Sequence, residues 1–327
     1  MTKHPIIIDN DTAQDDCVTI LMALTDPAAD LRALTTVAGN VSFDRQIANA
    51  QMTLSVAGAL GQVPIFAGCR QPMLRDWVSA EDVHGDGSGG LHMELAEDGV
   101  ESEHAVDALI RLTAESPGEI SIVAIGPLTN IATAVVKDRR FVENVKSLYI
   151  MGGSNNGRGN VTPAGEFNFY VDPHAAQIVM RAGFEDMHIL TWDPVTLRDV
   201  TYPRREYDKL TQIDTPIAKF FKKVCDATLE FNESVGVDGS THPDSATLAS
   251  LLHPEIVLAS NKYQVEVETG SELTLGYSSM RWEKFESEPN ANVIEELDSA
   301  AFYKLLERTL QTSTTATRHI QGLDSDN

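Results

Sequence analysis

The sequence predicts a single α/β domain with a mostly parallel central β-sheet flanked by helices, a Rossmann-like core. Short β-rich runs alternate with helical patterns through the first half of the chain, at the spacing of strand–helix–strand units. The runs are apolar throughout, which is typical of strands buried on both faces of a sheet. No linker, repeat or low-complexity segment divides the 327 residues, so we expect one domain rather than two.

The first half of the chain contains the clearest elements. Short apolar runs bounded by polar or turn residues predict strands over residues 5–8, 31–37, 63–67, 120–125 and 147–151. Apolar side chains at helical spacing predict helices over residues 16–24, 43–60, 104–115 and 128–136. Residues 68–100 are rich in glycine and acidic residues and are expected to form a loop.

The second half is expected to complete the sheet and its covering helices. Helices are predicted over residues 172–182, 215–231 and 298–311, with a further helix starting at Asp244. A strand is predicted over residues 187–191, and strand-like alternation runs through residues 263–297. We expect the folded domain to span residues 1–311 and the polar tail, residues 312–327, to be frayed.

The chain is strongly acidic, with 48 Asp and Glu against 25 Lys and Arg and a formal net charge of −23. Such a surface repels nucleic-acid phosphates and anionic lipids, so we expect neither nucleic acid nor a membrane as a partner. The three scattered cysteines, Cys17, Cys69 and Cys225, are expected to be reduced thiols. No apolar run reaches the length of a membrane span, and the N-terminus lacks the long apolar core of a signal peptide. We therefore expect a cytoplasmic protein.

Four carboxylates, those of Asp9, Asp11, Asp15 and Asp16, lie within eight residues where the first strand gives way to a helix. Open α/β sheets bind ligands at this end of their strands. Helix capping explains one or two acids there, but crowding four is costly unless a cation neutralises them. Oxygen ligands favour Ca²⁺ or Mg²⁺ over zinc, and the spacing and glycine of an EF-hand loop are missing.

Two classes of enzyme place Asp-x-Asp at such a strand end. A phosphatase of the haloacid dehalogenase type would have Thr or Val two positions after the second Asp, where this chain has Ala13. The other class matches five stretches in order: DNDTAQDD at 9–16, VAGNV at 37–41, IGPLTNIA at 125–132, MGG at 151–153 with GNVTPAGEFN at 159–168, and DGSTHPD at 238–244. Over nearly its whole length the chain thus resembles the inosine–uridine-preferring nucleoside hydrolases, which are ribonucleoside N-ribohydrolases.

The resemblance implies a Ca²⁺ ion held by Asp11, Asp16, Asp244 and the main-chain carbonyl of Ile125. It also implies that Asp11 activates a metal-bound water to cleave the N-glycosidic bond of a ribonucleoside, which releases ribose and a free nucleobase. The residues that it implies in substrate binding are Asp15, Asn40, His84, Met151, Asn160, Glu166, Phe167, Asn168 and Asp244. Relatives are commonly dimers or tetramers, so a homodimer or homotetramer is expected.

The chain departs from the family's pattern at two places. Residues 12–14 (Thr-Ala-Gln) replace the usual Pro-Gly-hydrophobic run, and Pro243 stands where well-studied members have the histidine that protonates the leaving base. The candidates for the leaving-group acid are therefore His242, His84 or no side chain at all, while Trp192 is expected to be structural. Two alternative functions follow: hydrolysis of another N-riboside, such as nicotinamide riboside or a modified nucleoside, and non-catalytic nucleoside or ribose binding.

Overall fold

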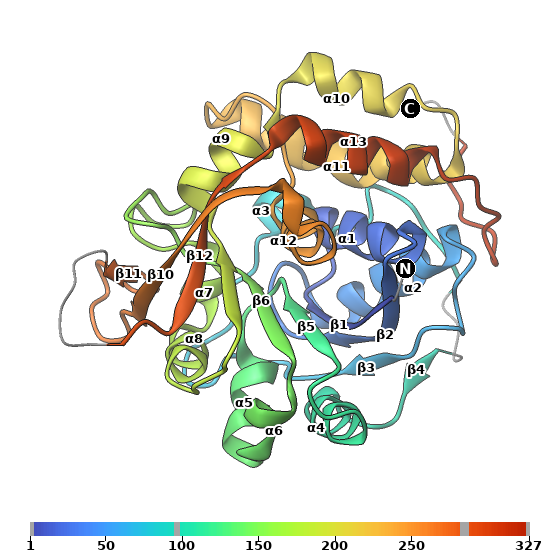
Figure 1. Ribbon diagram of the computed structural model, residues 1–327. Coiled ribbons are helices and arrows are strands. Elements are labelled where there is room, and N and C mark those ends of the chain that lie inside the picture. The colour runs from blue at the N-terminus through green and yellow to red at the C-terminus, as the bar shows by residue number, and fades with distance from the viewer. Residues whose placement is uncertain (1–2, 95–98, 282–287, 325–327) are drawn as a thin grey trace.

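A ten-stranded β-sheet runs through the centre of the computed structural model, which describes residues 3–94, 99–281 and 288–324 (Figure 1). In spatial order its strands are β11 (Ser278–Arg281), β10 (Val257–Val267), β12 (Ala291–Leu297), β7 (Met187–Leu190), β6 (Ser147–Met151), β5 (Ser121–Ala124), β1 (His4–Asn10), β2 (Ala29–Thr36), β3 (Ile65–Ala67) and β4 (Val100–Glu101). Every neighbouring pair from β12 to β4 is parallel. Only β10 runs antiparallel to its neighbours within this described sheet, which confirms the expected mostly parallel arrangement.

The order of the strands reverses in the middle of the sheet. β1 pairs with β2 on one side and with β5 on the other, so the chain builds one half of the sheet outward from β1 and then returns to build the second half from β5. This reversal opens a crevice at the carboxyl ends of β1 and β5, and open α/β sheets bind ligands in such crevices. The acidic segment after β1 leaves the sheet at this point.

Helices cover both faces of the sheet, as expected (Figure 1). One face packs against α1 (Gln14–Thr25), α2 (Phe43–Val56), α11 (Pro216–Ser234), α12 (Pro243–Leu252) and α13 (Ser299–Gln311). The other packs against α4 (Ala105–Glu115), α5 (Thr129–Lys137), α6 (Arg140–Asn144) and α8 (Pro173–Met180). Shorter elements lie in the connections: α3 (Glu81–His84), α7 (Phe167–Val171), η1 (Trp192–Thr196), α9 (Leu197–Asp199), α10 (Arg204–Thr211), η2 (Pro254–Ile256) and the ribbon of β8 (Thr201–Tyr202) and β9 (Ser240–Thr241).

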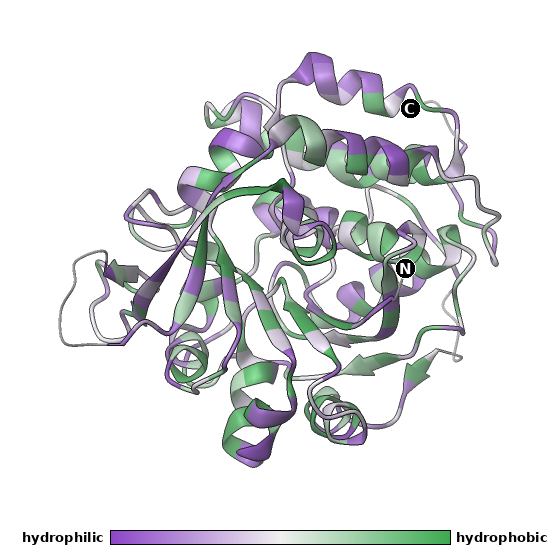
Figure 2. Cartoon of the chain, in the orientation of Figure 1, coloured by the Kyte–Doolittle hydropathy of each residue, from purple (hydrophilic) through white to green (hydrophobic). Residues whose placement is uncertain are grey.

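The apolar run of β1 supplies both cores. Ile6 and Ile8 pack into one core and Ile7 into the other, because successive side chains of a strand point to opposite faces. Hydrophobic residues accordingly concentrate in the central strands and on the inner sides of the helices (Figure 2). Within the described residues, no helix combines the length and the hydrophobicity needed to cross a membrane.

The C-terminal tail differs from the expectation that it would be frayed. Ile320 and Leu323 are buried in the core on the α2 face of the sheet. The Thr317 N–H donates to the Ser55 carbonyl (3.0 Å), and the Thr314 hydroxyl donates to the Val56 carbonyl (2.7 Å). These are carbonyls of the last turn of α2, which have no partner within the helix. The tail is therefore attached through backbone groups that its polar composition did not indicate.

Candidate active site

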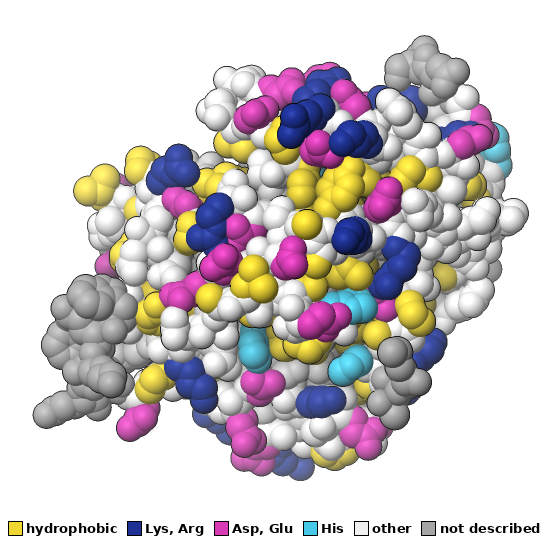
Figure 3. All heavy atoms as spheres, turned by 45° about the horizontal axis from the view of Figure 1, so that its top comes forward, with side chains coloured by type: hydrophobic (Ala, Val, Ile, Leu, Met, Phe, Trp, Pro, Cys, Tyr) yellow, Lys and Arg dark blue, Asp and Glu magenta, His cyan; other side chains and the backbone are white. Residues whose placement is uncertain are grey.

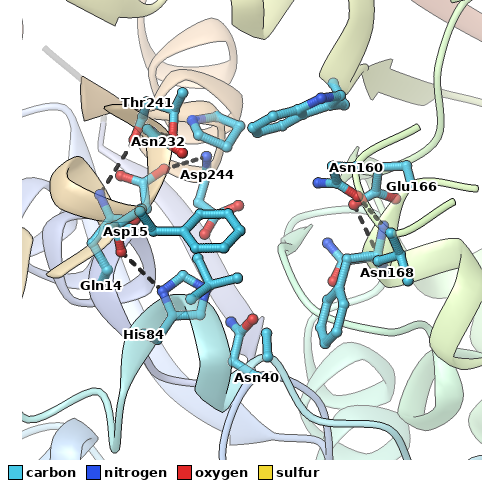
Figure 4. A pocket seen from close by; sticks show the side chains of 18 of the residues that line it. Gln14, Asp15, Asn40, His84, Asn160, Glu166, Asn168, Asn232, Thr241 and Asp244 are labelled. Atoms are coloured by element: carbon cyan, nitrogen blue, oxygen red, sulfur yellow. Dashed lines mark hydrogen bonds between the residues drawn. The ribbon is translucent and has the colours of Figure 1, made fainter. Parts of the chain in front are cut away.

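A cavity of about 500 Å³ opens at the carboxyl ends of β1, β5 and β6 (Figure 4). Its lining comes from the segments that follow these strands, from the loop after β2, and from α3, α7, α11 and α12. Twelve of the thirteen predicted site residues lie in this region, although they are spread over more than two hundred positions of the chain. Those lining the cavity are Asp15, Asp16, Asn40, His84, Ile125, Met151, Asn160, Glu166, Phe167, Asn168 and Asp244. Asp11 lies directly beneath, where its backbone N–H donates to Asp16 Oδ1 (3.1 Å).

Asp11 is held in a cradle of two glycines. Its Oδ2 accepts a hydrogen bond from the Asn40 N–H (2.8 Å). A Cβ added to Gly39 would lie 2.0 Å from Asp11 Oδ2, and one added to Gly126 would lie 2.8 Å from Oδ1, so neither position has room for a side chain. Asp11 Oδ1 is buried, and no described residue donates a hydrogen bond to it. One carboxylate oxygen is therefore fixed by the protein while the other still lacks a partner.

Asp16 and Asp244 complete a group of three neighbouring acids. Asp16 Oδ2 accepts from the N–H of Ala13 (3.0 Å) and from Asn40 Nδ2 (3.3 Å), which closes the turn at the start of α1. Burial, together with the charges of the neighbouring carboxylates, raises the pKa of Asp11 and of Asp244 well above the usual aspartate value. Within the described residues, no group of three or more His, Cys, Asp or Glu side chains is arranged so that it could hold a metal ion. The acids are close enough for their charges to oppose one another, and a cation would relieve this opposition.

Asp15 connects this acidic segment to α12. Its Oδ2 accepts from the N–H of Asp244 (2.6 Å; Figure 4). Ser245 donates to the same carboxylate, through its N–H to Oδ2 (3.3 Å) and through its hydroxyl to Oδ1 (2.9 Å). A carboxylate at the N-terminus of a helix satisfies free N–H groups and interacts favourably with the helix dipole. A side chain from α1 therefore caps α12 and determines where Asp244 lies.

Glu166, at the far side of the cavity, caps α7 in a similar way. Its Oε2 accepts from the Gly153 N–H (2.8 Å) and its Oε1 from the Asn168 N–H (3.0 Å). Burial raises the pKa of Glu166 to about 7, although these hydrogen bonds act in the opposite direction. Along α7 the side chains alternate in role: Phe169 is buried in the core, whereas Phe167 and Asn168 line the cavity.

Asn168 ties together the ends of two strands. Its Nδ2 donates to the carbonyls of Ile125 and Met151, each at 3.1 Å. Asn160 reaches the same region from the preceding loop, and its Oδ1 accepts from the Phe167 N–H (2.8 Å). Figure 4 shows Asn160, Glu166 and Asn168 gathered on one side of the cavity. We call the set of Met151, Asn160, Glu166, Phe167 and Asn168 the amide wall.

The opposite side of the cavity is built mainly by the end of α11. Thr228, Phe231 and Asn232 line the cavity at helical spacing, and His84 of α3 is hydrogen-bonded to Thr228 between Nδ1 and Oγ1 (3.0 Å). Asn232 Nδ2 donates to the Gly239 carbonyl (2.9 Å), which holds the loop before β9. We call the set of His84, Thr228, Phe231 and Asn232 the α11 wall.

Comparisons with known proteins agree with this geometry. The profile of a family described as "Inosine-uridine preferring nucleoside hydrolase" matches residues 6–304. The chain belongs to this family.

It is 36% identical to an uncharacterized protein of Schizosaccharomyces pombe, covering 92% of this chain and 97% of that one. It is 32% identical to the pyrimidine-specific ribonucleoside hydrolase RihA of Photobacterium profundum, covering 94% and 99%. Its fold is similar to that of the plant nucleoside hydrolase PpNRh1, with a TM-score of 0.86 and 29% identity over 94% of this chain and 99% of that one. The protein is thus a nucleoside hydrolase.

The position of His242 in this nucleoside hydrolase contradicts its expected role as the leaving-group acid. Its side chain is fully buried and does not line the cavity. Nε2 is hydrogen-bonded to the Ser240 hydroxyl (3.0 Å), Nδ1 lies 3.4 Å from Asp15 Oδ1, and the ring stacks on Phe221. These contacts hold the imidazole in the core behind Asp15. The next residue, Pro243, lines the cavity instead.

Further residues line the cavity that the sequence did not assign to the site. Trp192, expected to be structural, lines the cavity, as do Gln14 and Arg158. Gln14 Nε2 donates to the Thr241 carbonyl (3.3 Å), so the unusual residue at position 14 supports the loop that leads to α12. The i, i+3, i+4 spacing of the α11 wall is visible in the sequence, but the same spacing also marks the buried face of the helix and gives no sign of a cavity.

Proposed function

We propose that this nucleoside hydrolase cleaves the N-glycosidic bond of ribonucleosides with Ca²⁺ as its cofactor and Asp11 as the base. The observation that carries the proposal is the unpartnered, buried Oδ1 of Asp11 beside two further acids at the switch point of the sheet. Pyrimidine ribonucleosides are the first substrates to test, because RihA of Photobacterium profundum, 32% identical, is named as pyrimidine-specific.

The chemistry of the donor atoms suits a hard divalent cation. Asp11, Asp16, Asp244 and the carbonyl of Ile125 would hold it through oxygen atoms, the ligands that Ca²⁺ prefers. When bound, the ion would supply positive charge that orients the ribose hydroxyls and lowers the pKa of the attacking water. The positive charge of the ion would also lower the pKa values of these carboxyls, which burial and mutual repulsion raise. Asp11 would then be ionised at neutral pH.

The protein's own groups would divide the remaining work. Asp11, oriented by the Asn40 N–H, would accept a proton from the water that attacks the anomeric carbon. Asn40, Asp15 and the amide wall would hold the ribose hydroxyls, because amides offer both donors and acceptors and carboxylates offer acceptors. As the base departs, positive charge develops on the sugar, and the acidic lining stabilises this charge more than it stabilises the neutral substrate.

The proposal is tested by incubating the purified protein with a panel of ribonucleosides, starting with uridine and cytidine, with Ca²⁺ and with a chelator, and measuring reducing sugar. We expect turnover that the chelator removes and that Ca²⁺ restores. Asp11→Asn should lower kcat by about 10³-fold or more, as the loss of a general base predicts. The matched control Asp44→Asn, at an exposed acid paired with Arg70, should retain full activity.

Two outcomes would contradict the proposal. If no member of a broad panel yields reducing sugar in the presence of Ca²⁺, the proposed Ca²⁺-dependent cleavage of ribonucleosides is wrong. If calorimetry shows tight nucleoside binding without turnover, the alternative of a non-catalytic binding protein gains support instead.

A further inference from the structure

The α11 wall faces the aglycone, which is the leaving part of a riboside. This placement rests on the proposed function. Since the amide wall and the acids take the ribose, the aglycone must lie toward His84, Phe231 and Asn232. A neutral nucleobase leaves as an anion unless a group on this side donates a proton to it. The supply of protons at the α11 wall therefore decides which aglycones can depart.

No described residue of the α11 wall is a suitable proton donor for the aglycone, and Glu166, whose pKa of about 7 would suit a general acid, lies on the opposite side of the cavity. Among the described residues that line the cavity, only Arg158 and His84 are basic. The Nε of Arg158 donates to Asp193 Oδ2 (3.0 Å), and a guanidinium does not release its proton in proteins. His84 is tied to Thr228, and burial lowers its pKa to about 4, although the charge of Asp82 acts in the opposite direction. The hydroxyl and amide groups of the wall can form hydrogen bonds but do not transfer a proton at neutral pH.

The same side of the cavity has features that attract positive charge. Asp82 of α3 lines the cavity near His84 and is exposed. The ring of Phe231, one residue before Asn232 in α11, also lines the cavity, and aromatic faces bind cations. The charge of Arg158, the one cationic side chain among the described lining residues once His84 is neutral, is offset by Asp193.

We propose that the site prefers ribosides whose aglycone is a cationic heteroaromatic ring. In this reaction the bond between the anomeric carbon and the ring nitrogen breaks, and its electron pair neutralises the charge of the ring. Water forms the new carbon–oxygen bond and loses its proton to Asp11 and then to solvent. The aglycone leaves neutral, so no acid is required on the α11 wall.

The test compares nicotinamide riboside, which carries a cationic pyridinium ring, with uridine and cytidine, and cationic 7-methylguanosine with guanosine. We expect kcat/KM for each cationic riboside to exceed that of its neutral counterpart by about 100-fold or more, the lower end of what a positioned general acid contributes. Equal or higher kcat/KM for the neutral ribosides would overturn the inference and leave the proposed function standing. Failure to hydrolyse any of these compounds would instead overturn the proposed function, and the inference with it.

Two variants test the wall itself. Asp82→Asn should reduce the ratio of kcat/KM for nicotinamide riboside to that for uridine by about fivefold or more, because it removes a charge that attracts the cation. The control Glu81→Gln changes the adjacent acid, which does not line the cavity, and should leave the ratio unchanged. Pro243→His places an imidazole at the cavity surface and should raise kcat/KM for uridine but not for nicotinamide riboside. An unchanged ratio in both Asp82→Asn and Pro243→His would argue against the inference.

Discussion

At the scale of single residues, the placement of Asp11 depends on what is missing around it. Gly39 and Gly126 have no side chains, and this absence gives the carboxyl its room at the end of β1. Asn40 supplies an N–H to one oxygen, and the second oxygen lacks a donor among the described residues. Gly39 after β2 and Gly126 after β5 are therefore required for steric reasons, since any side chain there would collide with Asp11.

We predict that Gly39→Ala lowers kcat by about 100-fold or more while the protein still folds. The new Cβ would lie 2.0 Å from Asp11 Oδ2 and must displace the carboxyl, at a cost in stability of about 1–3 kcal/mol. Kinetic assays and thermal unfolding measure the two effects separately. Gly270→Ala is the matched control, because its Cβ would meet only the Glu268 carboxyl oxygen at 3.4 Å. Full activity in Gly39→Ala would show that the cradle does not position Asp11.

At the scale of elements, a charged contact joins the ends of three helices. Asp26 follows α1, His253 follows α12, and Arg308 lies in the last turn of α13. His253 Nε2 lies 2.7 Å from Asp26 Oδ2, and Arg308 pairs with the same carboxylate. α1 carries Asp15 and Asp16 and α12 carries Asp244, so this contact fixes the helices that hold the acids.

We predict that Asp26→Asn lowers the free energy of unfolding at pH 7 by about 1–3 kcal/mol, since it removes the charge of a buried carboxylate from its contacts with His253, Arg308 and the Ala28 N–H. Burial alone would raise the pKa of Asp26, but the hydrogen bonds from His253 and Ala28 and the charge of Arg308 hold it below the usual value. A lowered pKa contributes stability that is present above the unfolded value of about 3.9 and is lost as the pH falls through the folded pKa. Urea unfolding at pH 7, 5 and 3.5 should show a difference between the two proteins that shrinks at the lowest pH. A difference that does not depend on pH would exclude the ionised carboxylate as its source.

The C-terminal tail is a second element whose contribution can be measured. Ile320→Ala should lower the free energy of unfolding by about 2 kcal/mol, because the side chain is buried in the core. His319→Ala, at the exposed neighbouring position, is the control and should have little effect. Equal midpoints for Ile320→Ala and the unchanged protein in urea would mean that the tail is frayed after all.

At the scale of the whole molecule, the chain carries a formal net charge of −23. On the face shown in Figure 3, acidic and basic side chains are interspersed. Exposed ion pairs such as that of Arg70 with Asp44 contribute little each, so the excess of acids leaves a net repulsion. The acids proposed to bind metal or substrate are few beside the 48 in the chain and do not account for this excess.

We predict that the melting temperature rises between low and molar NaCl, because salt screens repulsion among exposed charges. The measurement is made with Ca²⁺ held constant, so that metal binding does not contribute to the shift. An unchanged or lower melting temperature in molar salt would show that net repulsion does not limit the stability of this fold.

Much of the fold and of the site follows from the sequence alone. The apolar runs predicted the strands from β1 to β7 except β4, and helical periodicity predicted α1, α2, α4, α5, α8 and the long helices of the second half. The ordered motifs identified the acids and the amide wall, because each motif is a continuous stretch that ends a strand or starts a helix. Local pattern determines these features, since burial on a sheet face and the turn after a strand depend on neighbouring residues.

Contacts between distant segments decided the rest. Asp15 caps α12 from 229 positions away, and the ring of His242 is drawn behind Asp15 by Phe221 and Ser240. The sequence determined that a histidine precedes Pro243, but only packing determined that its side chain points away from the cavity. The α11 wall was also decided by the tertiary structure, because a helix face that lines a cavity and one that fills a core share the same spacing.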